Sequence, residues 1–309
     1  MTYEVQIVLA TYNGGHYLAE QLDSILAQSH TGWQLLAHDD GSSDDTLAIL
    51  RAYQSRLGHQ LQVVEHPSCG GASANFSFLL NRTNAPYVFL ADQDDIWQPD
   101  KLERFMRAIR RAEVLAGIQT PLLVHSDLEL VDDAGQPVAP SFWQYQHLDP
   151  RWGDHVPRLL TQNVVTGCAT LVNRALLDLA LPVPADAVMH DWWLALVACA
   201  TGKVIWMPST TVRYRQHSSN TLGAQKFDWH YILSKLGSLT DRQAARTTLM
   251  QNTQQARAFA ERFSDNGWAA EAALFGSLSE MSRLLKARTI LQHGFWKVGL
   301  LRNLAWLFL

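Results

Sequence analysis

Short apolar runs alternate with helical patterns through the first 125 of the 309 residues. Between the runs, apolar residues recur at helical spacing, as at Leu18, Leu22 and Ile25. Strands that alternate with helices form βαβ units, so we expect an α/β fold with a mostly parallel sheet flanked by helices. Five runs have the length and composition of buried strands: 5–10, 33–38, 61–65, 87–91 and 122–125.

The pattern changes in the second half of the chain. The segments 164–173 and 203–215 predict two further strands, and an apolar helix is predicted to begin at His190. From residue 225 the apolar residues keep a helical spacing to the end. We therefore expect a sheet domain at 1–224 and a helical extension at 225–309.

Distinctive polar residues follow three of the predicted strands. Thr11, Tyr12 and Asn13 follow the first, the pair Asp39–Asp40 the second, and the segment Asp92–Asp95 the fourth. In a parallel sheet, ligands bind beyond the carboxyl ends of the strands. We therefore expect these sequence-distant residues to converge on one cleft.

Three carboxylates crowd into the four positions after the fourth strand, those of Asp92, Asp94 and Asp95. Like-charge repulsion destabilises such a cluster unless a cation neutralises it. Oxygen ligands of this kind favour Mg²⁺ or Mn²⁺, which also bind substrate phosphates. The alternative is an acidic loop whose aspartates cap the following helix.

The other polar motifs each allow two interpretations. Asp39–Asp40 either forms a turn of its own or accepts hydrogen bonds from a nucleobase or a ribose. Asp191, at the start of an apolar helix, either caps that helix or acts as a general base. Arg213, Arg215 and His217 either bind a diphosphate or form a solvated strand edge.

Composition and charge exclude several classes of protein. A hydrophobic content of 47% excludes a mainly disordered chain, and a net charge of −4 argues against a protein that coats nucleic acid. Three cysteines without a CxxC pair indicate neither a disulfide framework nor structural zinc, and favour a reducing compartment. The N-terminus lacks a signal-peptide pattern, and the most apolar run has nine residues. We expect a cytoplasmic protein.

The C-terminal part has the opposite charge to the rest. Residues 225–309 contain eleven Lys or Arg and six Asp or Glu, and from Arg283 there are five basic residues and no acidic one. Apolar and aromatic side chains lie among these basic residues: Phe295, Trp296, Leu300, Leu301, Leu304, Trp306 and Phe308. The pattern suits an interfacial helix on the inner, anionic face of the cell membrane. The alternative is a helix packed against its own domain or against a second subunit.

Taken in order, the motifs resemble those of the inverting family 2 glycosyltransferases, which have the GT-A fold. The resemblance spans about residues 3–220. The sequence of the segment Ala91–Trp97, together with Tyr214–His217 and Asn220, resembles that of a rhamnosyltransferase-like subset of this family. The membrane spans and the Gln-x-x-Arg-Trp motif of processive synthases are missing from this sequence, so we expect transfer of one or a few sugars. Four segments carry the resemblance: Ala10–Gly14, Asp39–Asp44, Asp92–Asp95 and His190–Trp192.

The resemblance implies a role for each motif. Asp94, together with His217, would bind Mg²⁺ or Mn²⁺, and Asp191 would be the catalytic base. Trp192 and Trp193 would lie near the acceptor. The nucleotide pocket would contain residues from the three strand ends: Thr11, Tyr12, Asn13, Asp39, Asp40 and Asp92.

The implied function is inverting, metal-dependent transfer of a sugar from a nucleoside-diphosphate sugar to a saccharide or lipid-linked saccharide in surface polysaccharide or O-antigen assembly. The resemblance favours dTDP-rhamnose as donor, and a UDP-sugar next. A nicotinamide oxidoreductase is disfavoured because the first turn is Thr-Tyr-Asn-Gly-Gly rather than G-x-G-x-x-G. The remaining alternative is a non-catalytic scaffold of the same fold that binds sugar or membrane. A homodimer is compatible with the sequence.

Overall fold

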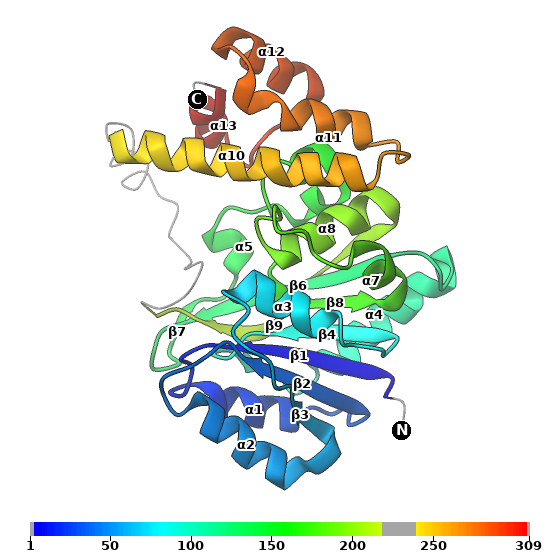
Figure 1. Ribbon diagram of the computed structural model, residues 1–309, viewed down its shortest axis with the longest axis vertical. Coiled ribbons are helices and arrows are strands. Elements are labelled where there is room, and N and C mark those ends of the chain that lie inside the picture. Colours follow the sequence, from blue (N-terminus) through cyan, green and yellow to red (C-terminus); the bar gives the residue numbers. More distant parts are fainter. Residues whose placement is uncertain (1–2, 218–238, 308–309) are drawn as a thin grey trace.

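A nine-stranded sheet forms the centre of the protein in the computed structural model, which describes residues 3–217 and 239–307 (Figure 1). The strands follow the order β3-β2-β1-β4-β8-β6-β9-β5, and β7 pairs with β6 at the side. Their bounds are β1 (Val5–Thr11), β2 (Trp33–Asp39), β3 (Leu61–Val63), β4 (Tyr87–Ala91), β5 (Ile96–Trp97), β6 (Leu122–Val131), β7 (Pro137–Ala139), β8 (Thr170–Asn173) and β9 (Lys203–Arg215).

The expected α/β class is confirmed, but the sheet is mixed rather than mostly parallel. The β3-β2-β1-β4 half and the β6–β9 pair are parallel. The other four pairings, β4–β8, β6–β8, β5–β9 and β6–β7, are antiparallel. The alternation of strands and helices along the sequence predicts parallel strand pairs, because these need a crossover helix. Antiparallel pairs need none, so the same pattern did not predict the four antiparallel pairings.

Helices cover both faces of the sheet and form a separate layer above it (Figure 1). The longer helices are α1 (Leu18–Leu26), α2 (Thr46–Leu57), α3 (Ala72–Leu80), α4 (Lys101–Ala116), α7 (Arg174–Ala180), α8 (His190–Thr201), α10 (Leu239–Arg262), α11 (Ala269–Gly276), α12 (Arg283–His293) and α13 (Leu300–Leu307). Single turns complete the set: α5 (Phe142–Tyr145), α6 (Val156–Leu159) and the 3₁₀ turns Gly58–Gln60, Pro150–Asp154, Gly167–Ala169 and Leu278–Glu280.

Two apolar clusters lie on the two faces of the sheet. Along β1, Val5, Ile7 and Leu9 belong to the cluster under α1, α2 and α4, whereas Val8 belongs to the cluster under α3, α7 and α8. This alternation is the two-residue period of a strand that is buried on both faces. It explains why the strand is apolar on both faces at 7–10, with the polar Gln6 only near its start.

The predicted strand at 164–173 is wrong over its first half. The structure starts β8 at Thr170 and puts a 3₁₀ turn at Gly167–Ala169. The backbone N–H of Gly167 donates to the carboxylate of Asp191 rather than to a neighbouring strand. Val164 and Val165 are buried by tertiary packing, which gave this loop the apolar pattern of a strand.

The C-terminal helices share a core with the sheet domain. Trp193 of α8 packs edge-to-face against Phe259 of α10, with ring centroids 6.2 Å apart. Phe275 contacts both Phe295 and Trp306, which are 0% and 2% exposed. Thus two of the tail aromatics expected to face a membrane, Phe295 and Trp306, are buried in the protein. The expected domain boundary at 224–225 lies outside the described residues. Among the described helices, none combines the length and apolar composition that crossing a bilayer requires.

Candidate active site

A cleft of about 660 Å³ opens beyond the carboxyl ends of β1, β2 and β4. Thr11 and Tyr12 line it from the end of β1, Asp40 from the end of β2, and Asp92 and Asp94 from the end of β4. The start of α8 and the loop before β8 complete the lining. Five of the strand-end residues that were singled out from the sequence therefore meet around one cavity, and Asn13, Asp39 and Asp95 do not line it.

Asp40 holds the loop 68–71 against the end of β2. Its carboxylate accepts hydrogen bonds from the Ser68 hydroxyl at 3.0 Å, from the Gly71 N–H at 2.7 Å, and from the N–H groups of Cys69 and Gly70. Burial acts to raise the pKa of Asp40, but these donors outweigh it and lower the pKa. Asp40 is therefore a fixed anion at the rim of the cleft.

Asp39 and Asn13 support the turn instead of lining the cleft. Asp39 accepts hydrogen bonds from the N–H and hydroxyl of Ser42, and from the Thr11 hydroxyl at 3.0 Å. The Asn13 side chain accepts from the Ser43 N–H at 2.8 Å, and its φ of 48° lies in the left-handed region that asparagine tolerates. Asp39 and Asn13 therefore hold the backbone of the turns that border the cavity, and their side chains do not line it.

Gln93 bridges two of the strand ends, a role that the sequence did not reveal. Its side-chain oxygen accepts from the Tyr12 N–H at 2.8 Å, and its side-chain nitrogen donates to the Tyr12 carbonyl at 2.9 Å. A Cβ atom on Gly14 would lie 2.2 Å from the Gln93 oxygen. A glycine at position 14 is therefore required for the bridge. The position of Gln93 between Asp92 and Asp94 was the only signal for it in the sequence.

Three carboxylates and one lysine lie close together at the end of β4: Asp92 and Asp94 line the cleft, and Asp95 and Lys101 are buried behind them. Burial, followed by the charges of Asp94 and Asp191, raises the pKa of Asp92 to about 7. Burial also raises the pKa of Asp95 well above its usual value and lowers the pKa of Lys101 to about 7. The Lys101 ammonium donates to the Cys168 carbonyl at 2.5 Å. This arrangement keeps a crowded acidic loop stable inside the fold.

The donor set fits a divalent cation. Oδ2 of Asp95 is buried and has no hydrogen-bond partner among the described residues, and Asp92, Asp95 and Cys168 present ligand atoms within 4.8 Å of one another. Burial raises the pKa of the Cys168 thiol well above its usual value, so the thiol stays protonated and is a poor ligand for Mg²⁺. The hard oxygen ligands that face the cleft are those of Asp92 and Asp94.

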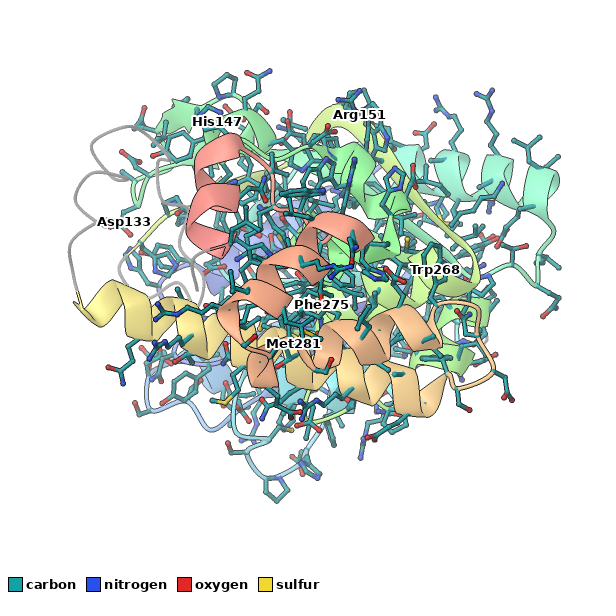
Figure 2. The ribbon with its side chains drawn as sticks, turned by 90° about the horizontal axis from the view of Figure 1, so that it is seen from above. Asp133, His147, Arg151, Trp268, Phe275 and Met281 are labelled. Carbon is teal, nitrogen blue, oxygen red and sulfur yellow. The ribbon has the colours of Figure 1, made fainter. Side chains whose placement is uncertain are left out.

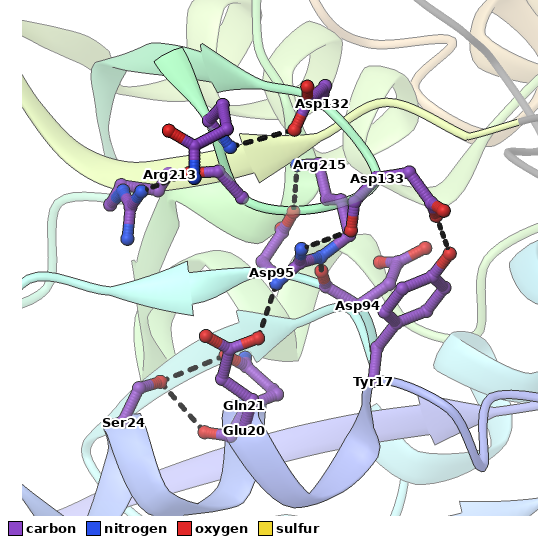
Figure 3. Close-up of polar contacts among 12 residues, drawn as sticks. Tyr17, Glu20, Gln21, Ser24, Asp94, Asp95, Asp132, Asp133, Arg213 and Arg215 are labelled. Atoms are coloured by element: carbon purple, nitrogen blue, oxygen red, sulfur yellow. Dashed lines mark hydrogen bonds and ion pairs between the residues drawn. The ribbon is translucent and has the colours of Figure 1, made fainter.

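His217 lies beside Asp94, with its Nε2 atom 2.8 Å from a carboxylate oxygen of Asp94. The imidazole stacks on the ring of Tyr17 at a centroid distance of 4.8 Å. Tyr17 in turn donates to Asp133, and this bond with burial raises the pKa of the Tyr17 phenol to about 12 (Figure 3). The structure thus joins Asp94 and His217, which are separated by 122 residues in the sequence.

Arg213 and Arg215 do not line the cleft. The Arg215 guanidinium donates to the carbonyls of Asp94 and Asp133 and forms an ion pair with Glu20 at 2.5 Å (Figure 3). Arg213 donates to the Gly135 carbonyl. Two arginines expected to bind diphosphate therefore hold the acidic loop and the turn after β6 in place. The reason is tertiary: β9 lies between β5 and β6, next to Asp95, and Tyr214, between the two arginines, is the residue of this strand end that lines the cleft.

Asp191 lines the cleft from the first turn of α8. Its carboxylate accepts hydrogen bonds from the Gly167 N–H at 2.9 Å and from the Trp192 N–H at 2.6 Å, and Asn163 approaches it at 3.4 Å. Burial raises the pKa of Asp191 to about 6, although the backbone donors oppose the shift. The group is therefore mainly ionised at neutral pH and can still accept a proton.

Trp192 and Trp193 lie in the core, not at the acceptor side of the cleft. Their exposed fractions are 8% and 0%, and their indole N–H groups donate to the carbonyls of Leu159 and Ala180. The expectation that they contact an acceptor is not met in this structure. The physical reason is that α8 is covered on all sides, by the sheet and by α10, so its large aromatics fill the interior.

Comparison with known proteins finds a family match in the first part of the chain. Residues 6–126 match the model of "Glycosyl transferase family 2". The dTDP-rhamnosyl transferase RfbG of Shigella flexneri is 28% identical over 227 residues, which cover 70% of this chain and 74% of RfbG. Three other curated relatives are matched over only 45%, 66% and 39% of their own length.

Solved structures share the fold at low sequence identity. TarS of S. aureus, in complex with UDP-GlcNAc, is 16% identical with a TM-score of 0.55, over 95% of this chain and 80% of TarS. The mannosyltransferase PcManGT from Pyrobaculum calidifontis, in complex with GDP-Man and Mn²⁺, is also 16% identical, with a TM-score of 0.54 over 99% of this chain and 85% of PcManGT. The chain therefore has the GT-A fold of these structures, and its residues 6–126 match glycosyl transferase family 2.

Proposed function

We propose that this chain transfers a sugar from a nucleoside-diphosphate sugar to a hydroxyl group of a saccharide acceptor, with inversion at the anomeric carbon. One observation carries the proposal: a buried carboxylate with a raised pKa, Asp191, lines the same cleft as the acidic pair Asp92 and Asp94. Such a transfer needs a general base and a group that holds the diphosphate, both within reach of the reacting carbon. Asp191 would supply the base, and the acidic pair would hold the diphosphate through a metal ion.

The nucleotide fits the strand-end side of the cleft. Asp40 and the loop that it holds offer hydrogen-bond acceptors and N–H donors to a base and a ribose. Tyr12, 58% exposed, offers a ring face beside them. Asp94 and His217, with Asp92, would hold the metal ion. Bound Mg²⁺ or Mn²⁺ supplies a Lewis acid that stabilises charge on the leaving diphosphate. PcManGT, which shares the fold, was solved with GDP-Man and Mn²⁺.

Asp191 acts as general base in the proposed reaction. The acceptor hydroxyl gives its proton to the Asp191 carboxylate while its oxygen forms a bond to the anomeric carbon. The bond from that carbon to the diphosphate oxygen breaks, and the nucleoside diphosphate leaves from the opposite face. The N–H groups of Gly167 and Trp192 fix the carboxylate in orientation. A pKa of about 6 makes it a competent base at neutral pH.

For the donor we propose dTDP-rhamnose, and a UDP-sugar as the second choice. RfbG, a relative over 70% of this chain, is named a dTDP-rhamnosyl transferase. The cleft also has an apolar wall that includes Phe142, Leu148, Val165 and Met189. Such a wall suits the methyl group of a 6-deoxysugar better than a hydroxymethyl group. The acceptor would be a saccharide or a lipid-linked saccharide of a surface polysaccharide.

Calorimetric titration with dTDP, UDP and GDP, each with and without Mn²⁺, tests the proposal. We expect metal-dependent binding that is tightest for dTDP, and loss of the metal dependence in Asp94→Ala. Asp178→Ala removes a carboxylate whose side chain is 67% exposed and serves as the matched control. A preference for UDP would support the proposed transferase activity but contradict dTDP-rhamnose as the donor. Absence of binding to all three nucleotides would overturn the site assignment.

A further inference from the structure

Helix α12 turns an apolar face toward solvent. Lys286, Thr289 and Ile290 point into the protein and are buried. On the opposite side, Leu284 is 87% exposed and Leu291 is 54% exposed. This is the reverse of the usual pattern, in which leucines face the core and polar residues face water. The outward leucines are therefore not needed for the fold.

Arginines lie on and beside the same face. Leu284, Arg288 and Leu291 follow the i, i+4, i+7 spacing that aligns side chains along one side of a helix. Arg283 precedes them, and Leu285, 51% exposed, lies beside them. We call these five residues the α12 surface: Arg283, Leu284, Leu285, Arg288 and Leu291.

The positive charge of the α12 surface is not neutralised within the described part of the chain. Arg246 of α10, Arg283 and Arg288 are exposed and form no ion pair with any residue of 3–217 or 239–307. Burial, and then the charges of Arg246 and Arg283, lower the pKa of Lys286. The cations are thus close enough to repel one another, and the site favours an anionic partner.

The carboxylates on neighbouring elements are already engaged. Glu271 of α11 lies 3.0 Å from His293, and Glu280 pairs with Arg257. From Arg283 to the end of the sequence there is no acidic residue. The surface therefore presents leucines and uncompensated arginines together, without a competing negative charge.

The location of α12 leaves its outward face accessible. The helix forms the upper edge of the molecule, in the layer of C-terminal helices above the sheet (Figure 1). Viewed from that side, α10, α11 and α12 lie in front of the sheet (Figure 2). Met250 of α10 adds a further apolar side chain that is 53% exposed.

We infer that the α12 surface docks the protein on an anionic lipid bilayer. The leucines would enter the boundary between headgroups and acyl chains, and the arginines would pair with lipid phosphates and carboxylates. Arg283 and Arg288 belong to the basic tail that the sequence singled out, but the apolar residues of this contact differ from those it suggested, because Phe295 and Trp306 are in the core. The inference goes beyond the proposed transfer reaction and is tested without catalysis.

A second exposed apolar patch provides a control within the same chain. At the end of α4, Val114 is 85% and Leu115 is 76% exposed. Three of the four arginines on this helix are engaged: Arg104 pairs with Asp100, Arg107 with Glu103 and Arg110 with Glu4. Arg111 forms no ion pair with a described residue. The α4 patch thus has the apolar exposure of the α12 surface but a single unpaired arginine, where the α12 surface has two with Arg246 beside them.

Flotation of the full chain with lipid vesicles tests the inference. The probes are vesicles of pure phosphatidylcholine and vesicles with about one third phosphatidylglycerol. We expect at least about tenfold tighter binding to the anionic vesicles, weakened by added salt. The double variant R283E/R288E should bind about thirtyfold more weakly, since each basic side chain contributes about fivefold near a charged surface. L284S/L291S should lose about tenfold.

The control variant is V114S/L115S, which should leave vesicle binding unchanged. Unaltered near-ultraviolet circular dichroism shows that each variant is folded. Equal binding to both vesicle types, an equal loss in the α4 control, or binding of no vesicle would each overturn the inference. The last outcome would favour an acidic protein partner for the α12 surface. None of these outcomes bears on nucleotide binding, so the transferase proposal is judged separately.

Discussion

Two aspartates line the same cleft and have similar exposed fractions, 7% for Asp40 and 9% for Asp191. Asp40 accepts hydrogen bonds from four residues of one loop, whereas Asp191 accepts two short ones from backbone N–H groups. Protein surrounds Asp191 more completely. As a result the pKa of Asp40 is lowered and that of Asp191 is raised to about 6.

This difference shows that environment rather than residue type assigns the chemistry. A carboxylate with many donors stays ionised and is suited to holding a loop and contacting a nucleotide. A carboxylate deep in the fold with few donors exchanges a proton near neutral pH and is suited to act as a base. Changes at the two sites should therefore affect different kinetic constants.

The largest effect is expected for Asp191→Asn. Because the amide cannot accept the proton, kcat should fall by about 10²–10⁴-fold, while the dissociation constant of the donor stays nearly the same. Single-turnover transfer and calorimetry measure the two quantities. Asp186→Asn, at an exposed carboxylate in the preceding loop, is the control. If Asp191→Asn weakened donor binding as much as it lowered kcat, Asp191 would have a structural role, and its proposed difference from Asp40 would be wrong.

Asp40→Asn should act mainly on donor binding. The amide nitrogen would face N–H donors of the loop 68–71, so the loop loses part of its anchor. Charged hydrogen bonds of this kind contribute about 1.5–3 kcal/mol, which predicts a donor dissociation constant roughly 10–100-fold weaker. Calorimetry of nucleoside-diphosphate binding measures it. A loss of kcat with unchanged affinity would reverse the roles of the two aspartates.

The pH dependence should separate the two residues without mutation. Below its pKa of about 6, Asp191 is protonated and cannot act as base. The rate should therefore fall about tenfold for each pH unit below that value and level off above it. The contribution of Asp40 to donor binding should stay constant across the same range, because its lowered pKa keeps it ionised. Metal-dependent binding should weaken as the pH falls below about 7, because Asp92 takes up a proton there. A rate that does not change between about pH 5 and pH 7 would contradict Asp191 as the base.

Gly14→Ala should give the smallest effect and act on the nucleotide side alone. The new methyl group would displace the Gln93 amide and break its two hydrogen bonds to Tyr12. We expect donor affinity to fall about fivefold to thirtyfold, since the two bonds contribute about 0.5–1 kcal/mol each, and kcat to change little. Gln93→Ala should match it, and the double variant should be no worse than either. Additive losses would show that the two residues act separately.

The sequence by itself determined the nucleotide side of the cleft. The alternation of strands and helices predicted the parallel half of the sheet. Because ligands bind at strand ends, the sequence also predicted that Thr11, Asp40 and Asp94 lie around one cleft, as they do. These signals are local: each motif directly follows its own strand. The residues at 6–126 that match the family model are the same ones that the periodicity explained.

Only the tertiary structure decided the rest of the site. Arg215 forms an ion pair with Glu20, 195 positions away in the sequence. The backbone N–H of Gly167 donates to the Asp191 carboxylate instead of pairing with a neighbouring strand. Trp193 and Trp306 fill the core, while Leu284 faces solvent. Sequence patterns indicate that a side chain is apolar or charged, but its partner depends on which distant segment packs against it. The pKa of Asp191 and the outward face of α12 follow from that packing, so they became visible only in the folded chain.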